Sequence, residues 1–195
     1  GRLKEAEFSL RKAIELNPYL AEAHSNLGII LKDIGKLKEA EKYFLKAIEL
    51  DDNLPQAHNN LGNILKDIGK LKEAEKYYRK AIKLKPDFVL AHYNLGTILK
   101  DIGKLKEAEI SLRKAIEIKF DFAEAHSNLG SILIDLGQLK EAEQFTRKAI
   151  ELDPQNQTIK DNLINSLTIY RPERINSNLI YVINEEFKEL NLSYK

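Results

Sequence analysis

The chain has 195 residues, of which 43% are hydrophobic and 31% are charged, and its 31 basic residues nearly balance its 30 acidic ones. The net charge of +1 gives no reason to expect nucleic acid as a partner, and no apolar run approaches the roughly 20 residues that span a bilayer. The absence of cysteine excludes disulfides and thiol catalysis. We therefore predict no nucleic-acid partner and no membrane partner.

The chain begins inside a repeated unit. Residues 32–41 return unchanged at 66–75 and 100–109, a step of 34 residues, and a looser copy occupies 134–143. Self-similarity at this period is typical of an array of stacked structural repeats. Residues 1–7 resemble the end of the same segment, and the chain contains no methionine. We therefore expect a piece of a longer protein whose first 20 residues form a half repeat.

Each full repeat predicts two helices. In residues 21–34 apolar side chains recur at spacings of three and four, which places them on one face of a helix. Gly35 then ends this helix, because glycine readily adopts the left-handed backbone conformation found at helix C-termini. A second helix spans about residues 37–50. A short break, often carrying proline as at Pro18 and Pro86, leads into the next first helix.

The spacing of the repeat resembles that of a known family. His24, Leu27, Gly28 and Leu31, followed by Ala40, Phe44 and Ala47, resemble the tetratricopeptide repeat, with histidine in place of its tryptophan and leucine in place of its tyrosine. Four full repeats fit, at residues 21–54, 55–88, 89–122 and 123–156. The resemblance implies an all-α solenoid, a right-handed superhelical arc of antiparallel helix hairpins with a concave and a convex face.

The two ends of the array are incomplete. Residues 157–170 resemble another first helix, and the amphipathic residues 171–195 are expected to cap the array, to begin a further domain or to contact a second copy. In the half repeat, Leu3, Leu10 and Ile14 are expected to form an exposed apolar patch. Both ends therefore offer surfaces through which a homo-oligomer would form.

Small residues predict where the two helices of a hairpin approach closely. One glycine recurs in each first helix and one alanine in each second helix, which suits a short interaxial distance of roughly 8–10 Å. We expect each glycine to face the alanine of its own repeat. The pairs are Gly28 with Ala40, Gly62 with Ala74, Gly96 with Ala108, and Gly130 with Ala142.

The residues predict neither an enzyme nor a metal site. The four histidines, His24, His58, His92 and His126, recur once per repeat and should lie about 10 Å or more apart, whereas zinc ligands lie about 2 Å from the ion. We expect them to pack between helices. No phosphate-binding loop, nucleophile motif or clustered carboxylates appear, so no catalytic residue and no cofactor are predicted. Lysines on the second helices favour a solvated face over a basic stripe for an acidic polymer.

One asparagine recurs in every first helix, including the terminal one. Asparagine is a middling helix former, so a helical array gains little from it structurally. Its amide both donates and accepts, and so can bond the main chain of an extended peptide. The row resembles the asparagine ladder in the tetratricopeptide arm of the O-linked N-acetylglucosamine transferases, which implies a place on the concave face. Bonds to neighbouring helices or to local backbone are the alternative. The row consists of Asn26, Asn60, Asn94, Asn128 and Asn162.

Further groove residues follow from the same placement. One helical turn along from the ladder lie Ile29, Asn63, Thr97 and Ser131. Alternating charges are expected near the far end of the groove, at Lys32 and Asp33, Lys66 and Asp67, and Lys100 and Asp101. Tyr93 replaces a smaller residue, so specificity is expected to vary along the groove.

The sequence therefore predicts a non-catalytic scaffold that binds an extended peptide or partner segment in its concave groove. Two alternatives stay open. The repeats form the substrate-recruiting arm of a larger enzyme such as a glycosyltransferase, or they form a self-association module. We expect a cytoplasmic location.

Overall fold

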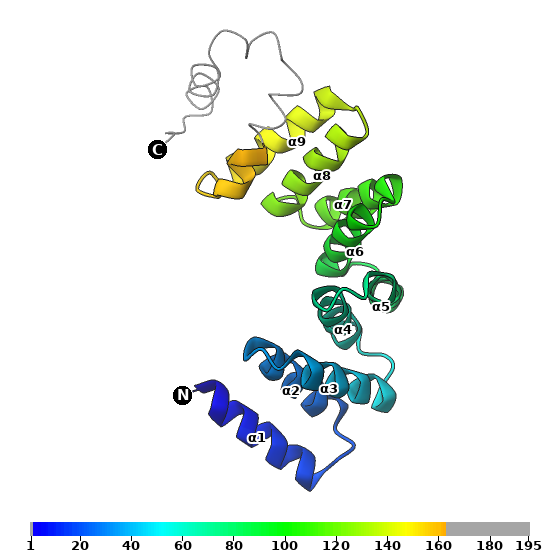
Figure 1. Ribbon diagram of the computed structural model, residues 1–195, viewed down its shortest axis with the longest axis vertical. Coiled ribbons are helices and arrows are strands. Elements are labelled where there is room, and N and C mark those ends of the chain that lie inside the picture. The colour runs from blue at the N-terminus through cyan, green and yellow to red at the C-terminus, as the bar shows by residue number, and fades with distance from the viewer. Residues whose placement is uncertain (1, 163–195) are drawn as a thin grey trace. The chain divides into compact units, whose positions relative to one another are not determined.

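The computed structural model describes residues 2–162, and within them residues 2–152 form nine α-helices and no β-strand (Figure 1). The predicted all-α repeat architecture is confirmed. The helices are α1 (Arg2–Leu16), α2 (Ala21–Asp33), α3 (Leu37–Leu50), α4 (Pro55–Asp67), α5 (Leu71–Leu84), α6 (Val89–Asp101), α7 (Leu105–Ile118), α8 (Ala123–Asp135) and α9 (Leu139–Leu152). Residues 157–162 are also helical. The rest of the predicted segment 157–170, and the predicted helix in 171–195, lie outside the described residues.

The chain divides into two compact units, which meet within α6, between Ile98 and Leu99. In the first unit α2 packs against α3 and α4 against α5, while α1 packs on α2 and α3 on α4. In the second unit α8 packs against α9, and α7 packs on α8. The buried core is leucine, isoleucine and alanine in both units, and in the first unit it also holds the rings of Phe44 and Tyr78.

The apolar patch expected on the half repeat is only partly exposed. Leu3 is 43% exposed, whereas Leu10 and Ile14 are half-buried. Three other side chains at this end are more exposed, Phe8 at 66%, Leu16 at 85% and Tyr19 at 80%. α1 buries no residue completely, because among residues 2–162 no first helix pairs with it as α2 pairs with α3.

Glycine ends the first helices as predicted. Gly35 has φ 80°, in the left-handed region, and its N–H bonds the Lys32 carbonyl oxygen at 2.9 Å. The next N–H, of Lys36, bonds the Leu31 carbonyl oxygen at 2.8 Å. Together these two bonds form the Schellman motif, which satisfies carbonyl groups at the end of the helix. Equivalent turns occur at Gly69, Gly103 and Gly137.

Gly28 and Gly62 face aromatic rings, so the prediction that these two glycines face alanine is wrong. A Cβ atom added at Gly28 would lie 2.9 Å from ring carbons of Phe44, and one added at Gly62 would lie 2.6 Å from a ring carbon of Tyr78. At Gly130 the added Cβ would meet the Thr146 hydroxyl and would lie 3.3 Å from the carbonyl oxygen of Ala142, the residue predicted to face this glycine. The alanines expected at Gly28 and Gly62, Ala40 and Ala74, lie one helical turn before these rings in the second helix. At these two glycines the missing Cβ makes room for an aromatic ring.

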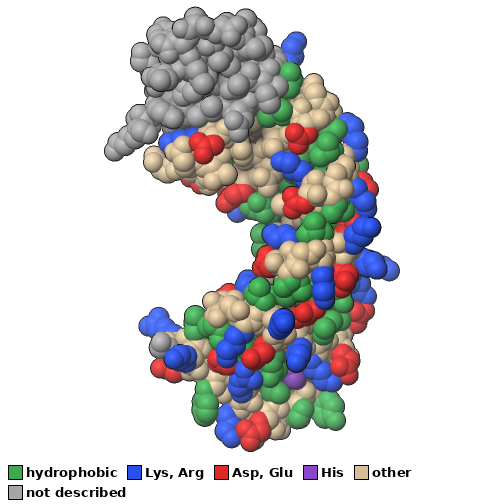
Figure 2. Space-filling model, viewed as in Figure 1, with side chains coloured by type: hydrophobic (Ala, Val, Ile, Leu, Met, Phe, Trp, Pro, Cys, Tyr) green, Lys and Arg blue, Asp and Glu red, His purple; other side chains and the backbone are tan. Residues whose placement is uncertain are grey.

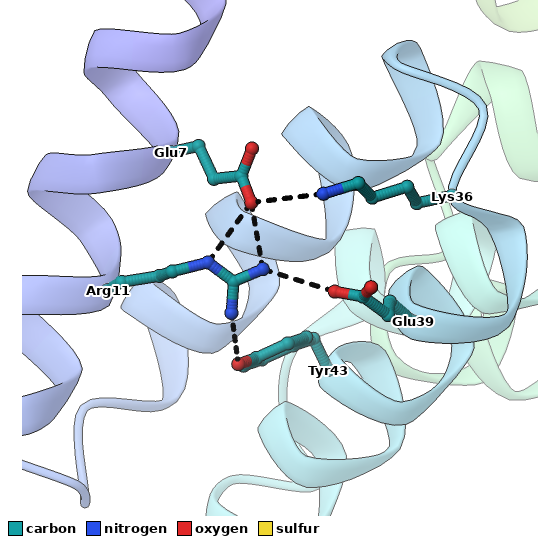
Figure 3. A network of polar contacts seen from close by, with 5 residues as sticks. All are labelled: Glu7, Arg11, Lys36, Glu39 and Tyr43. Atoms are coloured by element: carbon teal, nitrogen blue, oxygen red, sulfur yellow. Dashed lines mark hydrogen bonds and ion pairs between the residues drawn. The ribbon is translucent and has the colours of Figure 1, made fainter.

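An ion-pair network joins neighbouring hairpins in the first unit (Figure 3). The Arg11 guanidinium donates to Glu7 in α1 at 2.8 Å, and to Glu39 at 3.1 Å and the Tyr43 hydroxyl at 3.0 Å in α3. Lys36 lies 3.5 Å from the same Glu7 carboxylate. In the second unit an equivalent set joins α7 and α9, formed by Arg113, Glu109 and Glu141. Because these contacts are partly exposed to solvent, each adds little to stability.

The histidines fasten each first helix to the turn before it. Each Nε2 lies 2.8–3.0 Å from the backbone carbonyl oxygen six residues earlier, at Pro18, Asp52, Pro86 and Phe120. A carbonyl only accepts, so Nε2 is the donor in each bond, and in the neutral imidazole Nδ1 then carries no proton. The Nδ1 atoms of His24, His58 and His126 are buried without a partner. Among the described residues, no group of three or more His, Cys, Asp or Glu side chains is placed to hold a metal ion.

The close approach at Gly62 predicts a penalty for a single methyl group. Gly62→Ala would normally stabilise a helix by about 1 kcal/mol. Here the methyl group meets the buried Tyr78 ring, and overpacking of this kind costs about 1–3 kcal/mol. We expect a lower urea midpoint in unfolding followed by circular dichroism, with the exposed Lys72→Ala as control. A higher midpoint for Gly62→Ala would contradict the contact.

The buried histidine predicts a loss of stability in mild acid. Burial lowers the pKa of His126 below its usual 6.5; the bond to Phe120 opposes the shift and the charge of Lys148 adds to it. Because the unfolded chain then binds the proton more readily, stability from the neutral His126 is present above about pH 6.5 and is lost as the pH falls through the folded-state pKa.

We therefore expect the urea midpoint to fall between about pH 7.5 and about pH 5.5, and to fall less in His126→Phe. The carboxyls of Glu7, Asp52 and Glu109, whose pKa values are lowered, titrate at more acid pH and do not contribute in this interval. An equal fall in both proteins would show that His126 carries none of the effect.

Candidate functional site

One face of each first helix is left uncovered by its second helix. In α2 the uncovered side chains follow one another at spacings of four, three and four residues, and they are exposed or half-buried: Glu22, Asn26, Ile29 and Asp33. The side chains on the opposite side of α2 are buried: His24, Leu27, Gly28 and Leu31. The same positions are uncovered in α4 and in the first part of α6. We call this surface of the first unit the amide face. Its residues are Glu22, Asn26, Ile29, Asp33, Gln56, Asn60, Asn63, Asp67, Leu90, Asn94 and Thr97.

The predicted asparagines of the first unit lie on this face in two different states. Asn26 is exposed and Asn60 is half-buried, and neither side chain makes a hydrogen bond among the described residues. Asn94, in contrast, donates from Nδ2 to the side-chain oxygens of Asn59 at 3.0 Å and Asn63 at 3.1 Å, both on α4. Two amides are therefore available to a ligand, and the third also ties α6 to α4.

In the second unit the predicted residues bridge neighbouring helices. The Asn162 amide donates to the Ser127 hydroxyl on α8 at 2.8 Å. The Lys100 ammonium donates to the Ser131 hydroxyl, also on α8, at 2.6 Å. Asn128 is half-buried on the same helix. Bonding to a neighbouring helix, one of the two alternatives that the sequence left open, therefore applies to Asn162 as it does to Asn94.

The lysine–aspartate pairs lie at the C-terminal ends of the first helices. Lys32 is 3.8 Å from Asp33, whereas no ion pair joins Lys66 to Asp67. Asp33, Asp67 and Asp101 are all exposed. Lysine in the last turn suits the negative end of the helix dipole, so these cations have a local role whether or not a ligand is present.

Models of the tetratricopeptide repeat match the greater part of the chain. One matches residues 21–54, 55–88 and 123–156, and two further models of the same repeat match residues 77–110 and 1–19. The chain belongs to the tetratricopeptide repeat family. No curated protein sequence gives a significant match.

Solved structures of other proteins share this tetratricopeptide fold. A crystal structure of MamA is 26% identical, with a TM-score of 0.73, and the match covers 78% of this chain and 90% of that one. YrrB, described as a tetratricopeptide repeat protein with an unusual peptide-binding site, is 25% identical, with a TM-score of 0.75 and 93% and 91% of the two chains covered. PilF of Pseudomonas aeruginosa is 21% identical, with a TM-score of 0.81, and the match covers 97% of this chain and 85% of that one. At this identity the likeness shows the fold alone.

Two residues of this tetratricopeptide array lie at the site without having been predicted. Asn59 is buried and accepts from Asn94, and the hydroxyl of Tyr78 donates to Asn63 at 2.8 Å. The signal in the sequence was a departure from the repeat. Asn59 stands where the other repeats have Ser25, Tyr93 and Ser127, and Tyr78 stands where they have Phe44, Leu112 and Thr146. Tyr93 therefore belongs to a position beside the amide face.

Charge does not single out another surface of the tetratricopeptide repeats. Lysine and arginine are mixed with aspartate and glutamate over the face drawn in Figure 2. On the second helices many lysines pair with a glutamate one turn away, as Lys46 does with Glu49 at 2.9 Å and Lys114 with Glu117 at 2.7 Å. Within residues 2–162 no helix is both long and apolar enough to cross a bilayer. The amide face is the best-supported candidate site.

Proposed function

We propose that the chain is a non-catalytic protein-interaction scaffold and that the amide face of the first unit binds an extended polypeptide by its main chain. The observation that carries this proposal is the state of Asn26 and Asn60. They occupy the same position in successive repeats, lie on the uncovered face and have no hydrogen-bond partner among the described residues. Membership of a family of interaction repeats and the likeness to the peptide-binding YrrB support it.

The chemistry of the amide suits the main chain of a peptide. Each carboxamide donates and accepts, as each peptide group does, so one asparagine can bond a carbonyl and an N–H together. A strand rises about 3.3 Å per residue and packed helices lie about 8–10 Å apart, so successive asparagines would meet roughly every third residue. Recruitment of substrates to a catalytic domain elsewhere in a longer protein would use the same surface.

Self-association is a second candidate, favoured by the exposed apolar side chains at the N-terminal end. Phe8 is 66% exposed on α1, and Leu16 and Tyr19 follow it. Such a contact would not involve the amide face. Sedimentation of the protein at the concentrations of the binding experiment distinguishes self-association from peptide binding. Self-association raises the sedimenting mass to that of a dimer or larger oligomer, whereas a monomer that binds a peptide gains only the mass of the peptide.

The peptide-binding proposal predicts a loss of affinity when the free amides are removed. The probe is the most enriched peptide from a random library of about 12 residues, long enough to cross three first helices. With the fluorescein-labelled probe, we expect Asn26→Ala with Asn60→Ala to raise Kd about 10-fold or more in fluorescence polarisation, since each amide supplies up to two hydrogen bonds.

The matched control is Asn17→Ala with Asn53→Ala, which removes two exposed asparagines in loops between repeats. Its affinity should stay within a factor of about two, and both double variants should keep the helicity of the parent. Methylation of single main-chain nitrogens in the probe should also weaken binding. Equal affinity of parent and Asn26/Asn60 variant at equal helicity, or no enriched peptide at all, would overturn the proposal.

A further inference from the structure

One repeat departs from the others where its two helices meet. In the repeat at residues 55–88, Tyr78 occupies the position that holds Phe44, Leu112 or Thr146 elsewhere. Its ring is fully buried against Gly62, as that of Phe44 is against Gly28. The phenol adds only a hydroxyl, and this hydroxyl donates to the side-chain oxygen of Asn63 on the amide face at 2.8 Å. Packing alone therefore does not require tyrosine here.

The hydroxyl belongs to a chain of amides. The Asn63 oxygen accepts from both Tyr78 and Asn94, at 2.8 and 3.1 Å, so both of its lone pairs are used. The Asn94 amide nitrogen donates to Asn63 and to Asn59, so both of its hydrogens are used. Burial, with a smaller contribution from Asp67, raises the pKa of Tyr78, so the phenol keeps its proton at neutral pH.

These bonds fix which atoms are left for a ligand. With its oxygen held, Asn63 has its N–H groups unbonded among the described residues, and with its nitrogen held, Asn94 has its oxygen unbonded. Asn26 and Asn60 have no such restraint and can turn to suit either partner. Between α4 and α6 the amide face therefore offers a fixed donor beside a fixed acceptor.

The geometry points to Tyr78 as a positioning residue that gives the bound peptide a direction. This inference rests on the proposed function. An extended strand shows C=O and N–H groups along each edge, and reversing the strand exchanges their places. The peptide can place a carbonyl oxygen against the Asn63 N–H groups and an N–H against the Asn94 oxygen when it runs in one direction, but not when it runs in the other. Because the amides are held before binding, less conformational freedom is lost when the peptide docks.

No other repeat in the described residues carries the same arrangement. In the first full repeat Phe44 and Ile29 hold the positions of Tyr78 and Asn63, and neither side chain can form a hydrogen bond. In the repeat at 123–156, the Thr146 hydroxyl donates to the Ala142 carbonyl oxygen at 2.8 Å within its own helix. The direction would thus be set at one place, while Asn26 and Asn60 contribute affinity.

The test is Tyr78→Phe, which keeps the ring over Gly62 and removes the donor. The library-selected probe is used, carrying a nitroxide at its N-terminus in one sample and at its C-terminus in another. With the parent protein we expect only one of the two labels to broaden the Asn26 side-chain amide signal in nuclear magnetic resonance spectra. With Tyr78→Phe we expect both labels to broaden it, and Kd to rise about 3- to 10-fold with little change in the urea midpoint.

Two further variants make the result decisive. Asn60→Ala should weaken binding yet keep the single direction, because it leaves the network intact. Asn63→Thr introduces the residue that the next repeat carries at the equivalent position, Thr97. We expect the peptide to bind this variant in both directions. If Tyr78→Phe does not fold, Asn63→Thr takes its place in the test. A single direction kept in Tyr78→Phe, or in Asn63→Thr, overturns this inference and leaves peptide binding intact. Failure of the proposed function itself would appear as parent binding that does not depend on Asn26 and Asn60.

Discussion

The close approach of the two helices in each hairpin is the constraint on which the rest of the structure depends. A missing Cβ at Gly28 or Gly62 lets an aromatic ring lie directly against the first helix. This contact commits one side of the first helix to the core and leaves the opposite side uncovered. The histidine bond to the preceding turn then fixes where that helix begins. The amide face is the consequence of these two contacts.

The array was predictable because its signals are local and repeated. The step of 34 residues gave the number of hairpins, and Gly35 with its equivalents ended the first helices with φ near 80°. The partner of each glycine was not predictable in the same way. Ala40 and Phe44 lie one turn apart on the same side of α3, and only the crossing of the two helices decides which of them meets Gly28.

The hydrogen bonds of the candidate site were not predictable from the sequence. The step of 34 residues gave Asn26, Asn60 and Asn94 the same position in successive repeats, and the family resemblance implied the concave face. Neither distinguished an unpartnered amide from one that bonds a neighbouring helix. That distinction depends on which side chain stands opposite. Asn94 meets Asn59 and Asn63, and Asn162 meets Ser127, so these amides have a structural role as well. Departures from the repeat, as at Tyr78, mark where the array is specialised.

The most direct measurement of the central claim is the side-chain amide spectrum of the ¹⁵N-labelled protein during a titration with the library-selected peptide. If the uncovered amides grip the main chain, the side-chain N–H signals of Asn26 and Asn60 shift in step with binding, and those of Asn17 and Asn53 in the loops stay in place. Unmoved Asn26 and Asn60 signals at saturating peptide would contradict the account.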